Sequence, residues 1–246
     1  YIAEGYPLPK ETIGIEQYVY VKKGMIAQRA LPYKEVDTEY ILLLDDDLYL
    51  APDAVERMYN GMTNNSGDVM CANVFPNHEA SFSEKLKWIF SIGTFPMKSN
   101  KWAFKIRKNG NYSYNNNPKN GIYESQSAAG ACSLWKLDVF KSVHFEDEAY
   151  FDKFSYPIGE DQLLFNKAYQ RGRKVLVDYD FPVQHLDAGA GYGKAVEERI
   201  IDNAAILFLI WHRTCLQSYG KICIPSYIRR ILVTIINSSI FRFFEK

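Results

Sequence analysis

Apolar residues recur along the chain in two spacings, one typical of strands and one typical of helices. The first spacing predicts strands over residues 18–21, 40–44, 68–75, 127–135 and 175–181. The second predicts helices over residues 24–30, 52–62, 81–90, 160–171, 194–216 and 228–235. Residues 98–121 are polar and rich in Asn, Lys and Tyr, which predicts a long loop. This order predicts an α/β domain over residues 1–190, with helices packed on a sheet, and a C-terminal helical extension over residues 191–246.

The composition narrows the class of protein. With 246 residues, 47% of them hydrophobic, the chain can build the core of one α/β domain. Basic and acidic residues balance at 29 each, whereas a nucleic-acid binder usually has a basic excess, so no nucleic-acid partner is expected. The four cysteines form no CxxC pair, which favours buried thiols of a cytoplasmic protein over a disulfide or a zinc site. The apolar runs are far shorter than the ~20 residues of a membrane-spanning helix.

Three consecutive acids, Asp45, Asp46 and Asp47, directly follow the apolar run YILLL of residues 40–44. Such a run predicts a buried central strand, and ligands of α/β sheets gather at the carboxyl ends of the strands. Adjacent carboxylates repel one another, and a divalent cation relieves this repulsion. We therefore expect Mg²⁺ or Mn²⁺ on Asp45 and Asp47, with Asp46 directed elsewhere. The alternative is a solvated turn or a helix cap near Asp53, although three acids exceed what a cap needs.

A second acidic motif, Gly159-Glu160-Asp161, precedes a predicted helix. By itself it is equally explained by the preference of acids for the first turn of a helix. Together with the cluster Asp45-Asp46-Asp47, this motif could take part in a transfer reaction. Glycosyl transfer with inversion needs a base for the acceptor hydroxyl proton and a cation for the departing diphosphate.

Three segments carry a resemblance to a known family, and they occur in the family's order. They are YILLLDDDLYLAPDAVERM, SAAGACSLWKLDVFKSVHFEDEAYF and SYPIGEDQLLFNKAYQRGRKVLV. They resemble the DxD strand and helix, the small-residue strand, and the ED motif of family 2 inverting glycosyltransferases. The resemblance covers residues 18–187 and implies a GT-A-like fold, a mixed and mainly parallel sheet flanked by helices.

The resemblance also implies roles for the two acidic motifs. Asp45 and Asp47 would bind the metal and the donor diphosphate, with Asp46 beside them in the donor site. Asp161 would be the catalytic base, and Glu160 would support it or contact the acceptor.

Four further residues receive roles from the resemblance. Ala129 and Gly130 would let the donor sugar approach the backbone, because small residues place no side chain in between. His185 would complete the metal shell, and Arg29 would lie near the nucleotide. A structural or surface role is the alternative for His185, and an ordinary helix-surface position is the alternative for Arg29.

Aromatic residues in polar sequence point to an acceptor site. Trp102 and Tyr112 are predicted to contact a saccharide acceptor, since aromatic faces suit the apolar faces of sugar rings. The segment 224–246 combines an apolar stripe with basic residues. It can pack on the domain, which the pattern favours, or lie on a membrane surface. A lipid-linked acceptor would bring the protein to the inner face of the membrane.

Family 2 members begin with a strand–helix–strand unit that holds the base and ribose of the nucleotide. Residues 1–17 are predicted as loop, so an N-terminally truncated fold is expected. The main hypothesis is a metal-dependent inverting transferase of bacterial polysaccharide biosynthesis. It would move a sugar from a UDP-sugar to a saccharide or lipid-linked saccharide. The alternative is a truncated, non-catalytic binding or scaffold module.

Overall fold

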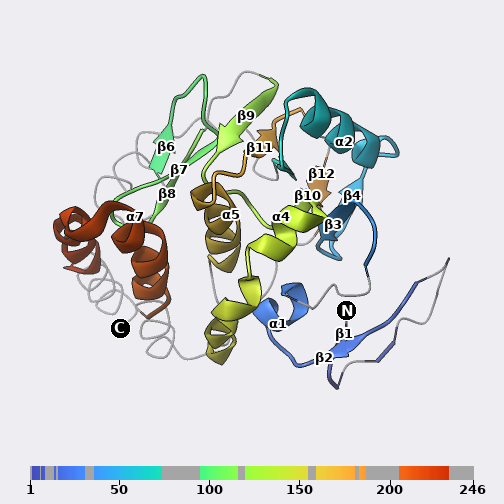
Figure 1. Ribbon diagram of the computed structural model, residues 1–246, viewed down its shortest axis with the longest axis horizontal. Helices are drawn as coiled ribbons and strands as arrows, with labels where there is room; N and C mark the ends of the chain where they lie inside the picture. Colours follow the sequence, from blue (N-terminus) through green and yellow to red (C-terminus); the bar gives the residue numbers. More distant parts are fainter. Residues whose placement is uncertain are drawn as a thin grey trace, which may run out of the picture.

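The protein is described by a computed structural model over residues 2–5, 7–8, 14, 16–30, 36–73, 95–115, 120–154, 159–180, 183–186 and 205–232. Its centre is a five-stranded sheet in the order β3-β10-β5-β11-β9 (Figure 1). The strands are β3 (Tyr40–Leu44), β10 (Cys132–Lys136), β5 (Val69–Ala72), β11 (Val175–Asp178) and β9 (Ile122–Ser125). β5 is parallel to β11, and β10 is antiparallel to both β3 and β5. β9 is antiparallel to β11. The predicted mixed α/β fold is confirmed, but of the four strand pairs in this sheet one is parallel and three are antiparallel, so its pairing is not mainly parallel.

Helices cover both faces of this sheet because successive strand residues point to opposite sides. On one face, Met58 and Met62 of α2 (Ala54–Asn64) pack with Met70 and Leu176. The opposite face carries the larger cluster. It is covered by α1 (Met25–Arg29), α4 (Leu137–Ser142), the 3₁₀ segment η2 (Phe145–Lys153) and α5 (Glu160–Gln170). The predicted helices over 24–30, 52–62 and 160–171 are confirmed.

Three smaller sheets surround the centre. β6 (Phe95–Met97) is parallel to β8 (Tyr112–Asn115), which is antiparallel to β7 (Phe104–Ile106). β4 (Leu48–Leu50) pairs with β12 (Val183–His185), and β1 (Ile2–Ala3) pairs with β2 (Tyr20–Val21). The predicted loop over residues 98–121 is therefore wrong in part. β8 buries Ser113 and Asn115, so its inward positions are polar and its alternation is hidden from a hydrophobicity pattern.

The expectation that 40–44 is a central strand buried on both faces is also wrong. Among the described strands, β3 lies at the end of the five-stranded sheet, and Leu44 is 46% exposed. Ile41, Leu42 and Leu43 are half-buried and line a cavity. An apolar run looks the same whether its residues are covered by neighbouring strands or line a cavity, so the sequence pattern could not distinguish them.

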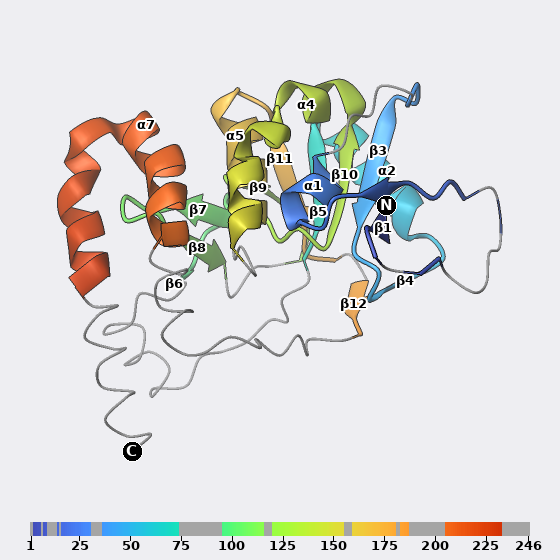
Figure 2. The same ribbon diagram turned by 90° about the horizontal axis from the view of Figure 1, so that it is seen from below.

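The C-terminal part is helical, as its pattern predicts. Residues 205–211 form an α-helix that continues as π-helix over His212–Leu216, then α7 (Gln217–Tyr219), the 3₁₀ turn η4 (Gly220–Cys223) and helical residues 224–232. Figures 1 and 2 show these helices and the β6-β8-β7 sheet beyond the β9 end of the central sheet. No helix among the described residues has the length and apolar character to cross a membrane. The predicted helix over 81–90 and the start of the one over 194–216 lie outside the described residues.

A buried ion-pair cluster joins η2 and α5 to the C-terminal helices. Glu148 of η2 is 2% exposed and lies 3.0 Å from Nζ of Lys167 in α5. Nε of Arg213, in the π-helical segment, lies 3.4 Å from the same carboxylate. A buried carboxylate requires such partners, so the cluster fixes η2, α5 and the C-terminal helices relative to one another.

Candidate functional site

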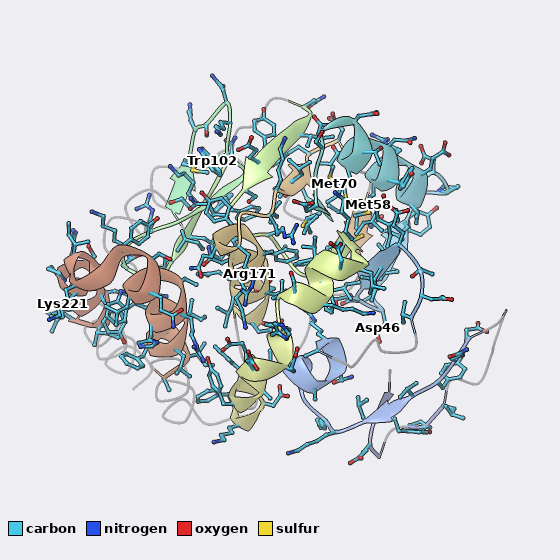
Figure 3. All side chains as sticks on the ribbon, in the orientation of Figure 1. Asp46, Met58, Met70, Trp102, Arg171 and Lys221 are labelled. Carbon is cyan, nitrogen blue, oxygen red and sulfur yellow. The ribbon has the colours of Figure 1, made fainter. Side chains whose placement is uncertain are left out.

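The acidic cluster lies at the carboxyl end of β3, beside a cavity of about 490 Å³. Asp45, Asp46 and Asp47 line this cavity together with Arg29 and Gly130. Asp46, labelled in Figure 3, is exposed, and Asp45 and Asp47 are half-buried by their accessible surface. Because β3, β5 and β11 run in the same direction, their carboxyl ends share this edge of the sheet.

Arg29 connects the two acidic motifs. Its Nη2 lies 3.0 Å from Oδ1 of Asp45, and its Nη1 lies 3.0 Å from Oε1 of Glu160. The Arg29 side chain is 19% exposed and that of Glu160 is 5% exposed, so water screens this contact weakly. The guanidinium thus holds the end of β3 and the start of α5 in one site.

Asp161 is fixed by backbone donors on both of its oxygens. The amide of Gln162 donates to Oδ1 at 2.6 Å, and the amide of Gly130 donates to Oδ2 at 3.2 Å. Each carboxylate oxygen has a second lone pair, so both can still accept a proton or a substrate hydrogen bond. The carboxylate is therefore oriented without losing its capacity as a base.

Gly130 allows these groups to come together. A Cβ atom at this position would lie 2.5 Å from Nη1 of Arg29 and 2.9 Å from Cβ of Asp161. No side chain fits there without displacing one of them. Ala129, half-buried, precedes it in the extended segment that leads into β10.

The helix that carries Arg29 is held from a distant part of the chain. Oδ1 and Oδ2 of Asp152 accept the amides of Ile26 and Ala27, each at 2.9 Å, at the first turn of α1. Gly24 permits this approach, since a Cβ there would lie 2.3 Å from the Asp152 carboxylate. The charge of Asp152 also suits the N-terminal end of a helix.

Burial raises the pKa values of both carboxyl groups at the start of α5. For Glu160, burial is the largest cause, the charge of Asp161 adds to it, and the charge of Arg29 opposes it. For Asp161, burial again dominates, against Arg29 and the amides of Gln162 and Gly130. Burial tends to lower the pKa of Arg29, but Glu160, Asp45 and Asp161 together raise it. A carboxylate whose pKa is raised is a stronger base than an exposed one.

Comparison with known proteins finds a family that part of the chain resembles. Residues 18–129 match the model of glycosyl transferase family 2. This match covers somewhat less than half of the chain and supports a glycosyltransferase. The matched segment includes Arg29, the three acids after β3 and Ala129, and it ends before Gly130, Glu160 and Asp161. No curated protein matches the chain.

The carboxylates of the candidate site suit a divalent metal in their chemistry. Asp45 and Asp47 offer the hard oxygen ligands that Mg²⁺ and Mn²⁺ prefer. The described residues contain no group of three or more His, Cys, Asp or Glu arranged to hold a metal ion. A metal here would thus need donor oxygens or water to complete its shell, which is usual for Mg²⁺.

The position of His185 is known at the level of the backbone. It is the register partner of Leu48 in the β4–β12 pair, and the next amide, that of Leu186, donates to the Asp47 carbonyl at 2.7 Å. The backbone of His185 therefore runs beside the acidic cluster. Its role as a metal ligand stays a prediction.

Of the two predicted acceptor residues, Trp102 lies away from Asp161, whereas Tyr112 is two residues from Gly110, whose carbonyl accepts from Nε2 of Gln162 at 2.7 Å. Trp102 contacts Tyr169 near the carboxyl end of α5, with ring centroids 6.2 Å apart, whereas Asp161 is at the start of this helix. Tyr112 lies in β8 and packs on Phe104 at 5.5 Å. Figure 3 shows Trp102 and Asp46 on opposite sides of the molecule.

Some residues of the candidate site carry no signal in the sequence. Met25 and Gln28 line the cavity, and Asp152 fixes α1. Asp152 follows Arg29 by more than a hundred residues, and its role depends on contact between α1 and η2. Gly24, the first residue of the predicted helix over 24–30, is a signal that could have indicated the close approach of another group at the helix start.

Proposed function

We propose that this chain transfers a sugar, with inversion, from a nucleoside-diphosphate sugar to a saccharide or lipid-linked saccharide acceptor. UDP is the expected nucleotide. The family match supports a glycosyltransferase, and one observation supports the mechanism. Asp45, Glu160 and Asp161, from motifs far apart in sequence, converge on Arg29 at the carboxyl edge of the sheet.

In the proposed reaction Asp161 takes the proton from the attacking acceptor hydroxyl. That oxygen bonds to the anomeric carbon from the face opposite the diphosphate. The bond from this carbon to the diphosphate oxygen breaks, and the nucleoside diphosphate leaves with the electron pair. Glu160 positions Arg29 and Asp161, and Gly130 and Ala129 leave room for the donor sugar.

Asp45 and Asp47 are the proposed ligands of Mn²⁺ or Mg²⁺, with His185 as a candidate third. When bound, the cation would neutralise charge on the departing diphosphate. Arg29 lies beside Asp45 and contributes a second positive charge at the same end of the site. Asp46, exposed at the mouth of the cavity, is proposed to contact the donor.

The test is turnover of a panel of UDP-sugars, with and without Mn²⁺, by the wild type and Asp161→Asn. Loss of a general base typically lowers kcat by about 10²–10⁴-fold, and this is the expected loss. Asp138→Asn is the matched control, because Asp138 is also an acid in the first turn of a helix, α4, and is exposed.

Two results would contradict the proposal. Equal turnover by Asp161→Asn and wild type would exclude Asp161 as the general base. Equal turnover with and without Mn²⁺ would exclude a catalytic role for the metal. Binding of the UDP-sugar with no transfer to any acceptor would support the alternative of a binding or scaffold module.

A further inference from the structure

A second cavity, of about 670 Å³, lies at the opposite edge of the central sheet from the acidic cluster. It is bounded by the start of β11, the end of β9, the carboxyl end of α5 and α7. Tyr169 follows Asp161 by eight residues on α5, so the rise of the helix alone separates them by about 12 Å. The two cavities share no lining residue.

Aromatic and polar groups meet in this second cavity. The half-exposed Trp102 ring lies against Tyr169, and both line it. The Tyr169 hydroxyl accepts from Nε2 of Gln126 at 3.2 Å, and the Ser218 hydroxyl accepts from Nε2 of Gln170 at 2.9 Å. Each hydroxyl that accepts from the protein keeps its own proton to donate to a ligand oxygen. An aromatic face with neighbouring hydroxyl donors is suited to a sugar ring.

The charge around Trp102 is positive. Nζ of Lys101 and Nζ of Lys105 lie over the Trp102 ring, 5.1 Å and 5.3 Å from its centroid. Trp102 is half-exposed, so a sugar ring would contact the part of the ring that these two cations leave open. Arg173 and Lys174 line the cavity from the turn after α5. Glu124 is the one acid among the lining residues, and it pairs with Lys101 at 3.4 Å. This excess favours an anionic ligand.

We propose that this cavity binds an acidic saccharide, one that carries carboxylate groups, with a sugar ring against Trp102 and its carboxylate beside Lys105 and Arg173. The inference that this saccharide is a remote part of the acceptor rests on the proposed function. The binding of an acidic saccharide to this cavity does not depend on that function.

The test is calorimetric titration of the whole chain with tetragalacturonate, and with maltotetraose as the neutral match. The acid is expected to bind at least about tenfold more tightly, which corresponds to about 1.4 kcal/mol, and to weaken with added salt. Trp102→Ala and the exposed Lys105→Glu should each weaken binding of the acid about tenfold. Lys153→Glu, an exposed change on η2 outside this cavity, should leave it unchanged.

Equal affinity for the two tetrasaccharides, no binding of the acid, or an affinity unaffected by Lys105→Glu would overturn the proposal. The outcome is separable from that of the transfer reaction. Asp161→Asn should bind tetragalacturonate normally while losing turnover, and Lys105→Glu should keep its turnover of a short neutral acceptor. If the protein binds tetragalacturonate but transfers no sugar, this result would support the second site and contradict the proposed function.

Discussion

At the scale of single residues, Arg29 decides the electrostatics of the candidate site. It contacts Asp45 and Glu160 directly, and its charge opposes the rise in the pKa of Asp161. A lone arginine in a predicted helix gave only a weak indication of this role. Its position between two acidic motifs is what gives each carboxylate a cationic neighbour in a partly dehydrated site.

The pH dependence of turnover should report this arrangement. A general base works when ionised, so kcat/KM falls as the pH drops through its pKa. In the wild type, burial raises the pKa of Asp161 above the ordinary aspartate value of about 3.9, so the acidic limb of the pH profile lies above this value. In Arg29→Met the opposing charge is gone, so the pKa of Asp161 rises further and the acidic limb moves to higher pH.

The measurement is kcat/KM between about pH 4.5 and 9. Arg171→Met serves as control, because Arg171 is exposed at the end of α5, away from Asp161. Identical acidic limbs in Arg29→Met and wild type would show that Arg29 does not tune the base.

At the scale of elements, the site depends on the contact of η2 with α1. The helix α1 has five residues, too few to be stable alone, and no side chain of its own caps its start. The carboxylate of Asp152 caps it instead, and so fixes the helix that carries Arg29.

Asp152→Ala is therefore expected to reduce both stability and turnover. Loss of an N-terminal cap costs about 1 kcal/mol, to be measured by urea unfolding. Turnover should fall beyond what this destabilisation explains, because α1 no longer holds Arg29 beside Asp45. Asp147→Ala, an exposed acid of the same 3₁₀ segment, is the matched control. An Asp152→Ala protein with wild-type turnover would exclude this positioning role.

At the scale of the whole molecule, the C-terminal helices both pack on the domain and expose apolar residues. Tyr227 stacks on Trp211 at 4.2 Å, and Arg230, 5% exposed, donates to the Asn109 carbonyl at 2.7 Å. Arg230 thus faces the protein. Ile228 is 52% exposed and Leu232 is 55% exposed. Residues 224–232 therefore pack on the domain. Membrane contact by residues 224–246 stays a prediction.

Flotation with anionic liposomes tests that contact. If Ile228 and Leu232 enter the lipid interface, replacing both by Asp should weaken binding at least about tenfold, because each buried aliphatic side chain contributes roughly 1.5–3 kcal/mol. Val55→Asp, which changes an exposed apolar residue on α2, is the control. A wild-type protein that stays with the unbound fraction would end the membrane hypothesis.

The sequence by itself determined the types of most elements, the two acidic motifs and the resemblance that the family match supports. These follow from local periodicity, from turn and cap residues, and from short motifs, all of which act within a few residues. It missed β9, and it missed β7 and β8 within the segment predicted as a loop. In β8 the buried positions are the polar Ser113 and Asn115, whereas β7 buries Phe104 and Ile106 but has only three residues.

Only the tertiary structure decided which distant residues meet. Arg29 reaches Glu160 across 131 positions, Asp152 caps a helix 126 positions away, and Trp102 lies at the far end of α5 from Asp161. The hydrophobic pattern indicates which face of a helix or strand is buried, but it does not indicate which other element packs against that face. The edge position of β3 and the second cavity are consequences of strand order, which no local pattern in this chain encodes.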